Sequence, residues 1–481
     1  MEKHVLFRAF GMHAKNIYRL TTSIAIILVL FSSSTVAQLS QYTPEQAKTF
    51  PLGEVTTPEN ALQHYLHNGD TTFHWKIKNI YDAGESKVYD LLLMSQKWRG
   101  ITWLHQLSIV VPRENNYDGA LLIIVGDGIK DSMPEWTNEE DKFMEAAGKI
   151  AAKNKAIVAV LRQTPNQPLF GDLAEDALIS YTLHQFKQDR DFTWPLLFPM
   201  VKSAARAMDA IQQFAGSKLN HPINRFVISG ASKRGWTTWL TGANDPRVEA
   251  IGPMVIDILN MPVNIDYQIK AWNGYSIQIE DYVKLGLPQQ SRTAGGGDII
   301  KMVDPYSYRR KLTMPKMIFM GTNDEYWVID AIKNYYDSIP GRNMIMYSPN
   351  VGHDLGDEKK AFNSLGSFFG MTLAHKAYPD CSWSTQVRNG VVEVTVKTSA
   401  DVLEEAVVWS ANSKNMIFHK AVWTSRSMGG TGKSKIVFSE KLPKSGFRAF
   451  YLDLKYKDAN GGDYTESTRM FVMDKHELKL H

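Results

Sequence analysis

The chain has 481 residues, of which 44% are hydrophobic and 22% charged, and its formal net charge is +4. This length exceeds that of one ordinary domain, so we expect two domains. No basic patch favours nucleic acid, neither a His-Glu-x-x-His nor a Cys-x-x-Cys motif supports a metal site, and the single cysteine, Cys381, excludes an intrachain disulfide.

Residues 1–37 have the pattern of an export signal. Four Lys or Arg residues precede an apolar core at 24–31, and the small residues Thr35 and Ala37 suit cleavage before Gln38. Because this leader holds four basic residues and one acidic residue, its removal lowers the net charge from +4 to about +1. The alternative, a membrane anchor, is disfavoured because the apolar core is shorter than a membrane span. We therefore expect a periplasmic or secreted protein with no stable membrane anchor after cleavage.

Strand and helix patterns alternate through the next 340 residues or so. Two continuous apolar runs, 120–125 and 156–161, are typical of strands that are buried on both faces of a parallel sheet. The other predicted strands are 72–80, 88–95, 101–111, 225–229, 251–258, 316–320 and 344–347, and the main predicted helices are 138–154, 173–188, 195–214 and 328–338. Strands that alternate with helices predict an α/β fold with a largely parallel sheet.

Two segments depart from this alternation. Residues 259–314 show weak strand signals and several aromatics, which indicates an insertion that acts as a lid over the sheet. From residue 379 to 481, β-type runs and turns predict a small β-sandwich-like domain of unassigned role. Its glycine-rich stretch 429–434 resembles a phosphate loop but precedes a strand instead of a helix, so we expect no cofactor there. The predicted organisation is a signal peptide at 1–37, an α/β domain at 38–378 and a β domain at 379–481.

The segment Gly230-Ala231-Ser232-Lys233-Arg234-Gly235 has the shape of a nucleophile elbow between a strand and a helix. The usual pattern is Gly-x-Ser-x-Gly, and here Arg234 takes the place of the second glycine, which follows at Gly235. A tight strand-to-helix turn needs glycines because the helix begins close to the strand that it leaves. The pattern favours Ser232 as a nucleophile, although an ordinary strand–turn–helix junction would look similar.

Two further residues stand where an α/β-hydrolase places its acid and its base. Asp324 follows the predicted strand 316–320 and His353 follows the strand 344–347, which gives the chain order Ser, acid, His. His353 would take the proton of Ser232, and Asp324 would orient the imidazole. The context predicts an α/β-hydrolase fold, with four other acids competing for the role of Asp324: Asp257, Glu325, Asp330 and Asp354.

The oxyanion hole needs two backbone N–H donors. We expect one from Lys233, the residue after the nucleophile, and the other from the loop Gly126-Asp127-Gly128, with the Asp127 carboxylate turned away and Gly128 as a neighbouring candidate. Trp236 and Trp327 are candidate pocket residues, although tryptophan is also common in cores. Arg234 either binds an anionic substrate group or forms a salt bridge with an acid such as Asp257.

Several motifs together make most of residues 50–370 resemble the PhoPQ-activated pathogenicity-related protein family. They are Pro165-Asn166-Gln167-Pro168-Leu169, the elbow through Thr237, Asp304-Pro305-Tyr306, Gly321-Thr322-Asn323-Asp324-Glu325 and Pro349-Asn350-Val351-Gly352-His353. The resemblance implies an exported protein with an α/β-hydrolase domain and names no substrate. The family also includes secreted proteins described as proliferation repressors.

The sequence therefore predicts an exported serine hydrolase that acts on an ester or amide in a small molecule, a peptide or a glycan ester. The basic residues Lys233 and Arg234 favour anionic esters or acidic peptides as the first substrates to consider. The alternative is a secreted signalling or binding protein that keeps a hydrolase scaffold with little or no catalysis.

Overall fold

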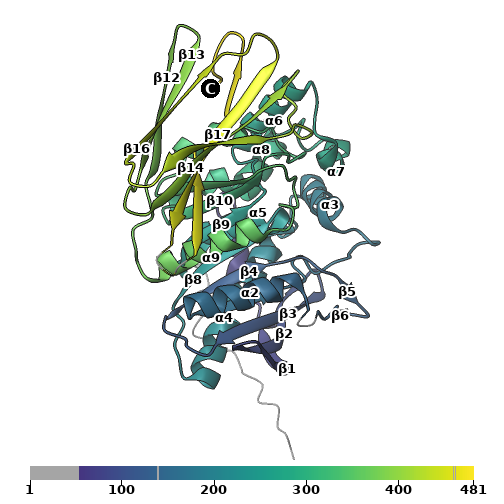
Figure 1. The fold of residues 1–481 in the computed structure, drawn as a ribbon. Helices are drawn as coiled ribbons and strands as arrows, with labels where there is room; N and C mark the ends of the chain where they lie inside the picture. Colours follow the sequence, from purple (N-terminus) through teal and green to yellow (C-terminus); the bar gives the residue numbers. More distant parts are fainter. Residues whose placement is uncertain (1–53, 138–139, 459, 461, 481) are drawn as a thin grey trace, which may run out of the picture. The chain divides into compact units, whose positions relative to one another are not determined.

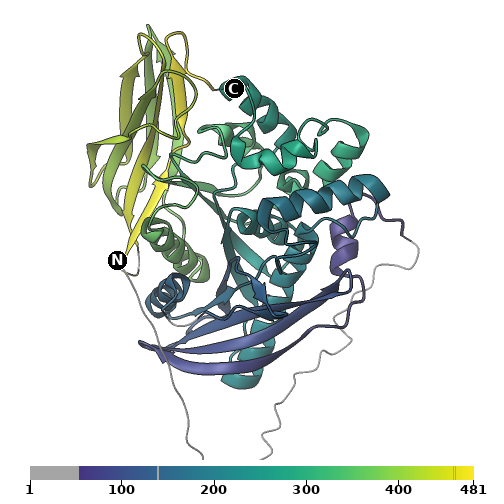
Figure 2. The same cartoon turned by 90° about the vertical axis from the view of Figure 1, so that its right-hand side faces the viewer.

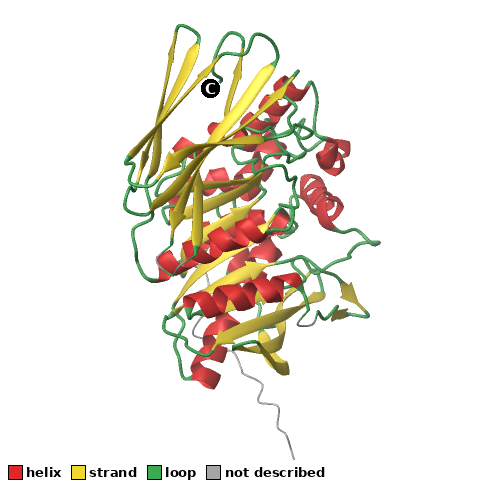
Figure 3. Ribbon diagram, viewed as in Figure 1, coloured by secondary structure: helices red, strands yellow, loops and turns green. Residues whose placement is uncertain are grey.

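One large mixed sheet runs through the described part of the chain (Figures 1 and 3), which in this computed structural model comprises residues 54–137, 140–458, 460 and 462–480. The predicted signal peptide lies outside the described residues. Within those residues, no helix has the length and apolar character needed to span a bilayer.

The α/β half of the sheet has the strand order β1-β2-β3-β7-β4-β8-β9-β10-β11. The pairs from β1 to β7 are antiparallel, and those from β7 to β11 are parallel. All residues of β4, β7 and β10 are buried, as expected for strands covered on both faces. The strands are β1 (His74–Ala83), β2 (Ser86–Trp98), β3 (Ile101–Pro112), β4 (Gly119–Ile124), β7 (Ile157–Leu161), β8 (Arg225–Ala231), β9 (Val248–Met254), β10 (Lys316–Gly321) and β11 (Asn343–Ser348), with a separate hairpin of β5 (Ile129–Lys130) and β6 (Met133–Pro134).

Helices cover both faces of this sheet and create two hydrophobic cores. On one face lie α1 (Ala61–Leu66), α3 (Glu175–Asp189), α4 (Leu197–Phe214) with a π-helical extension η2 (Ala215–Leu219), and α5 (Lys233–Asn244). On the other lie α2 (Lys142–Asn154) and α9 (Lys359–Leu373). Helix α2 begins four residues later than predicted because Asp141 caps it by accepting hydrogen bonds from Phe143 N and Met144 N. These layers confirm the predicted α/β fold.

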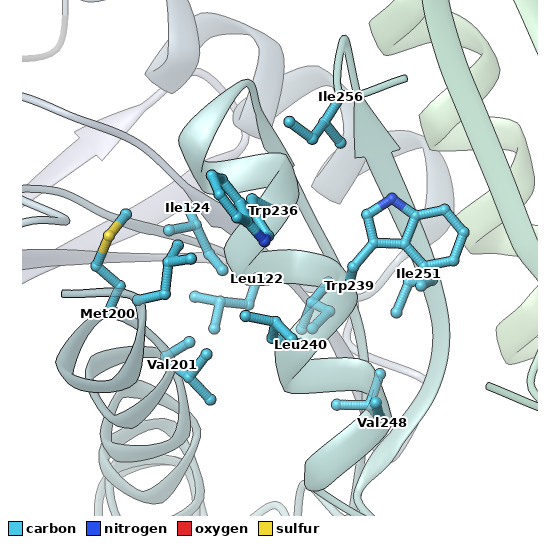
Figure 4. Close-up of a cluster of buried hydrophobic side chains, with 14 of the residues drawn as sticks. Leu122, Ile124, Met200, Val201, Trp236, Trp239, Leu240, Val248, Ile251 and Ile256 are labelled. Atoms are coloured by element: carbon cyan, nitrogen blue, oxygen red, sulfur yellow. The ribbon is translucent and has the colours of Figure 1, made fainter. Parts of the chain in front are cut away.

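Helix α5 is the one that carries the elbow, and a stripe of apolar residues fixes it to the sheet. Trp236, Trp239, Leu240 and Ala243 recur at helical spacing and are all at most 7% exposed. In Figure 4 the first three project from α5 among side chains of the sheet and of α4. The buried face of α5 therefore fixes the position of its first turn, which follows the end of β8.

The insertion at 259–314 is helical, although its sequence shows weak strand signals. It contains α6 (Met261–Trp272), η3 (Ile277–Ile279), α7 (Glu280–Lys284), α8 (Ala294–Val303) and η4 (Pro305–Lys311). Asp304 ties its two ends, because its carboxylate accepts hydrogen bonds from Met261 N at 2.8 Å and Tyr306 N at 2.9 Å. The predicted helix at 328–338 is instead two 3₁₀ turns, η5 (Ala331–Asn334) and η6 (Tyr336–Ser338).

The C-terminal strands form two layers, and one of them continues the main sheet. A three-stranded sheet contains β12 (Cys381–Arg388), β13 (Val391–Thr398) and β16 (Lys435–Lys441). The other layer extends the main sheet from β11 through β18 (Asp463–Ser467), β17 (Phe447–Lys457), β14 (Leu403–Ser413) and β15 (Thr424–Gly430), with β19 (Phe471–Asp474) also paired to β17. Strands β1 and β15 lie at opposite ends of the main sheet and are purple and yellow-green, respectively, in Figure 2. No break in the sheet marks the boundary that we predicted at residue 379.

Candidate active site

Ser232 lies at the turn between β8 and α5, with φ 57° and ψ −121°. Close contacts explain why the two positions around it, Gly230 and Gly235, are glycines. A Cβ at Gly230 would lie 2.8 Å from Cβ of Arg234, and a Cβ at Gly235 would lie 2.6 Å from the carbonyl oxygen of Met254 in β9. The late position of the second glycine therefore matches the point where α5 passes closest to the neighbouring strand.

Ser232, His353 and Asp324 come from the ends of three parallel strands and form one hydrogen-bonded chain. Ser232 Oγ lies 2.8 Å from His353 Nε2, and His353 Nδ1 lies 2.8 Å from Asp324 Oδ2. With the imidazole proton on Nδ1, His353 donates to Asp324 and can accept the hydroxyl proton of Ser232. The geometry needed for base-assisted attack by a serine is present.

Tyr326 is a residue of this site that the sequence reasoning missed. Its backbone N–H donates to Asp324 Oδ1 at 2.8 Å, and its ring stacks on the imidazole of His353 with centroids 4.0 Å apart. It therefore orients both the acid and the base. The signal that could have identified it is its position two residues after Asp324, where an Asx turn places a backbone N–H against the carboxylate.

Among the described acids, Asp324 is the one that hydrogen-bonds His353. Asp257 is fully buried and accepts a hydrogen bond from Tyr335 Oη at 2.6 Å. Asp330 binds Lys333 at 2.9 Å, and Asp354 is exposed. These contacts leave Asp257 and Asp330 with structural partners of their own.

The predicted oxyanion donors come from two places, the start of α5 and the loop after β4. Lys233 is the first residue of α5, where backbone N–H groups have no acceptor within the helix. In the other loop, Asp127 has φ 81° and its carboxylate binds Arg162 at 2.7 Å, while Gly128 bridges to Gln167. Gly126, one position earlier, lines a cavity of about 210 Å³ together with Ser232 and His353. The loop residue beside the serine is thus Gly126, and Asp127 turns away towards Arg162.

The two basic residues of the elbow bind acids at the start of α3. Arg234 is 9% exposed and makes two hydrogen bonds with Glu175, at 2.8 and 2.6 Å, while Lys233 Nζ lies 2.7 Å from Asp176. Although burial raises the pKa of Glu175, the hydrogen bonds from Arg234 and Gln167 and the charges of Arg234 and Lys233 together lower it from 4.5 to about 2. The partner of Arg234 is therefore Glu175 and not Asp257, and the guanidinium predicted to bind substrate is committed to an internal ion pair.

The loop that carries the motif 165–169 hydrogen-bonds to both partners of this ion pair. Arg234 Nε donates to the carbonyl of Thr164 at 2.6 Å. The amide of Gln167 donates to Glu175 Oε1 at 2.6 Å and accepts from its backbone N–H at 2.8 Å. The loop therefore supports the ion pair that holds the elbow.

Trp236 and Trp327 border a cavity of about 100 Å³ that also contacts Ser232. Trp236 Nε1 donates to the carbonyl of Val303 at 2.6 Å, and Trp327 Nε1 to that of Val255 at 3.4 Å. These hydrogen bonds anchor both indole rings at the wall of the cavity. In the ranges that the structure describes, no cluster of three or more His, Cys, Asp or Glu could hold a metal ion.

Two asparagines of the family motifs bind the segment 414–423, which connects β14 to β15. Asn323, next to the acid, donates to the carbonyl of Ala421 at 2.7 Å and to that of His419 at 3.2 Å. Asn350, in the loop of the base, donates to the carbonyl of Trp423 at 3.0 Å and accepts from its backbone N–H at 2.7 Å. A segment between the C-terminal strands therefore fixes both loops that carry catalytic candidates.

Replacement of Asn350 tests this support. Asn350→Ala leaves two backbone groups of Trp423 without partners, which we expect to cost about 1–3 kcal/mol of folding free energy. We also expect kcat for an ester substrate to fall by up to about 100-fold, with KM little changed, because a small displacement of the base spoils its alignment. The matched control is Asn412→Ala, at an exposed position of β14. Equal effects of the two substitutions on kcat would contradict this role.

Replacement of the two rival acids identifies the one that serves His353. Asp324→Asn should lower kcat by about 10⁴-fold because the amide fixes the wrong imidazole tautomer. Asp257→Asn should leave kcat within a few-fold of the wild type, since Asp257 contacts Tyr335 and not His353. Steady-state hydrolysis of a chromogenic ester measures both, and a larger loss for Asp257→Asn would reverse the assignment.

The stability of Asp257→Asn should depend on pH. Burial, and then the neighbouring Asp324 and Asp330, raise the pKa of Asp257 from 3.8 to about 8. Since the unfolded chain ionises this carboxyl near 3.8 and the folded chain keeps it protonated, wild-type stability falls as pH rises between these values. The neutral amide removes that loss, so the variant's Tm should gain on the wild type as pH rises from 4 to 8. A constant Tm difference would show that Asp257 is ionised in the fold.

Comparison with known proteins shows which family the chain resembles. The family model described as PhoPQ-activated pathogenicity-related protein matches residues 62–418. The chain is 28% identical over 447 residues to autocrine proliferation repressor protein A of Dictyostelium discoideum, with 86% of this chain and 89% of that protein covered.

Solved structures of esterases are also similar. Acetyl xylan esterase 1 from Thermoanaerobacterium sp. matches with a TM-score of 0.45 and 17% identity, over 67% of this chain and 99% of that one. The S-formylglutathione hydrolase from Agrobacterium tumefaciens matches with a TM-score of 0.41 and 10% identity, over 62% and 99% of the two chains. The strand order, the crossover helices and the elbow after β8 are those of the α/β-hydrolase fold, as predicted. Because the family model matches residues 62–418, which is more than half of the chain, the chain belongs to the PhoPQ-activated pathogenicity-related protein family.

Proposed function

We propose that this protein is a serine hydrolase that cleaves an ester or amide bond. The observation that carries the proposal is the chain of two 2.8 Å contacts from Ser232 through His353 to Asp324 at the ends of three parallel strands. A chance cluster of polar side chains would lack both the strained backbone of the serine and the chain order of the three residues.

The reaction follows from the roles that these positions allow. His353 accepts the proton of Ser232 as Oγ attacks the carbonyl carbon, and Asp324 stabilises the imidazolium. The backbone N–H groups of Lys233 and Gly126 are the proposed donors to the oxyanion, and the loss of one such donor costs about 100- to 1000-fold in rate. His353 then protonates the leaving group, and water repeats the sequence on the acyl-enzyme.

The relative from Dictyostelium discoideum, whose name describes an autocrine proliferation repressor, suggests a second candidate function. On this alternative the protein is a secreted signalling or binding protein, and the hydrolase scaffold turns over little or no substrate. The two functions differ in one property that can be measured directly, namely whether Ser232 is a reactive nucleophile.

A fluorophosphonate probe measures that property. We expect the folded wild-type protein to be labelled covalently at Ser232, and Ser232→Ala to lose labelling and to lower ester hydrolysis by roughly 10⁶-fold. The control is Ser382→Ala, at an exposed serine of β12, which should be labelled like the wild type. An unlabelled wild type with an intact thermal transition would favour the signalling function.

Export is the second part of the proposal. We propose that residues 1–37 are removed and that the mature protein, which starts at Gln38, is periplasmic or secreted. Expression of the full chain in a bacterial host, followed by mass spectrometry of the N-terminal peptide, should find Gln38 as the first residue in the exported fraction. An intact leader on protein retained with the membranes would count against export by cleavage.

A further inference from the structure

The inserted helices enclose a cavity beside Ser232 whose walls are mostly apolar. Its volume is about 100 Å³, and its apolar lining comes from α3, α5, the segments after β9 and β10, and the insertion. Apolar residues of this wall include Trp236, Ile258, Met261, Ile265, Ile299 and Val303. A cavity of this kind stabilises an apolar group that leaves water, and Ser232 is among its lining residues.

The charged groups at the edge of this cavity are already paired. Asp176 lies 2.7 Å from Lys233 Nζ and accepts a hydrogen bond from Tyr282 Oη at 3.0 Å. Arg234, the other cation of the elbow, binds Glu175. Two positive and two negative side chains thus balance one another, and a charged substrate group would lose its hydration in the cavity without gaining a partner.

The position of His353 decides which part of the substrate enters this cavity. His353 lines the second cavity at the serine, of about 210 Å³, together with Gly126 and Glu358, and it does not line the cavity beneath the inserted helices. Because the base returns its proton to the leaving group, the leaving group must lie on the side of His353. The acyl chain is then directed to the opposite side, beneath the inserted helices.

The volume limits the length of that chain. An apolar cavity of about 150 Å³ holds one benzene molecule. A cavity of about 100 Å³ in the same measure therefore holds an aliphatic chain on the order of four carbons. Ile265 of α6 stands in its wall, while Ile269, one turn further along the same helix, is 40% exposed and outside it.

We propose that the protein hydrolyses esters of short, uncharged aliphatic acids and that Ile265 limits the length of the acyl chain; this rests on the function proposed above. Ser232 Oγ forms the bond to the acyl carbon as the bond to the alcohol oxygen breaks, and the serine proton passes through His353 to the departing alcohol. Water then adds to the acyl-enzyme, a proton again passes through His353 to Ser232, and the free acid leaves. This replaces the expectation of anionic substrates that the basic elbow raised.

A series of p-nitrophenyl esters from acetate to dodecanoate tests the proposal on the full-length protein. For the wild type, kcat/KM should be highest near butyrate, and the neutral butyrate ester should exceed the hemisuccinate, which carries a carboxylate at similar length, by more than about tenfold. Ile265→Phe should move the optimum to acetate and lower the butyrate-to-acetate ratio by about tenfold or more. Ile265→Ala should extend the optimum to longer chains.

The control is Ile269→Phe, which adds the same ring to the same helix outside the cavity and should keep the wild-type chain-length profile. Fluorophosphonate labelling of every variant separates the two proposals. Labelling together with a flat profile, a preference for the hemisuccinate, or a profile that Ile265→Phe and Ile269→Phe change equally would overturn the acyl assignment and leave the hydrolase function standing. A wild type without labelling would overturn both.

Discussion

The candidate site depends on the backbone of Ser232 being held at φ 57° and ψ −121°, a region that non-glycine residues rarely occupy. Such a conformation costs on the order of 1–3 kcal/mol and persists only where the surroundings enforce it. On one side of the turn the N–H of Ser232 donates to the carbonyl of Met254 at 2.9 Å. On the other side the buried face of α5 fixes the helix that follows (Figure 4), so neither end of the turn can relax.

The ion pair of Arg234 and Glu175 adds a constraint of a different kind. The Arg234 side chain is 11% exposed and that of Glu175 is 39% exposed, so solvent screens the pair and it contributes little net stability, while the loss of Glu175 would leave the mostly buried guanidinium without its carboxylate partner. The pair therefore specifies one arrangement of α5 and α3 more than it stabilises the fold. The guanidinium of this pair also explains Gly126, since a Cβ there would lie 2.7 Å from Nη2 of Arg234.

The parts of the site that sequence reasoning predicted are those encoded locally. A strand end followed by Ser232, Asp324 or His353 is visible within a few residues, and the parallel sheet brings such ends to one edge. Glu175 was missed because its contact with Arg234 joins segments that lie 59 residues apart in the chain, whereas Gly126 belongs to the loop that the sequence indicated. The helices of the insertion were missed for a local reason: α8 begins with Ala294 followed by three glycines, whose helix propensity is poor, so tertiary packing decides its structure.

The C-terminal strands, through the segment that joins β14 to β15, also contact the loops that carry Asp324 and His353. Asn323 and Asn350 line neither of the two cavities at the serine. Their amides instead bind the segment between β14 and β15, and the family match ends at residue 418, inside that segment. Because the same strands also extend the main sheet from β11, the strand that precedes His353, a change in their packing would reach the base through both the sheet and the asparagines. The β layers are thus part of the framework that aligns the site.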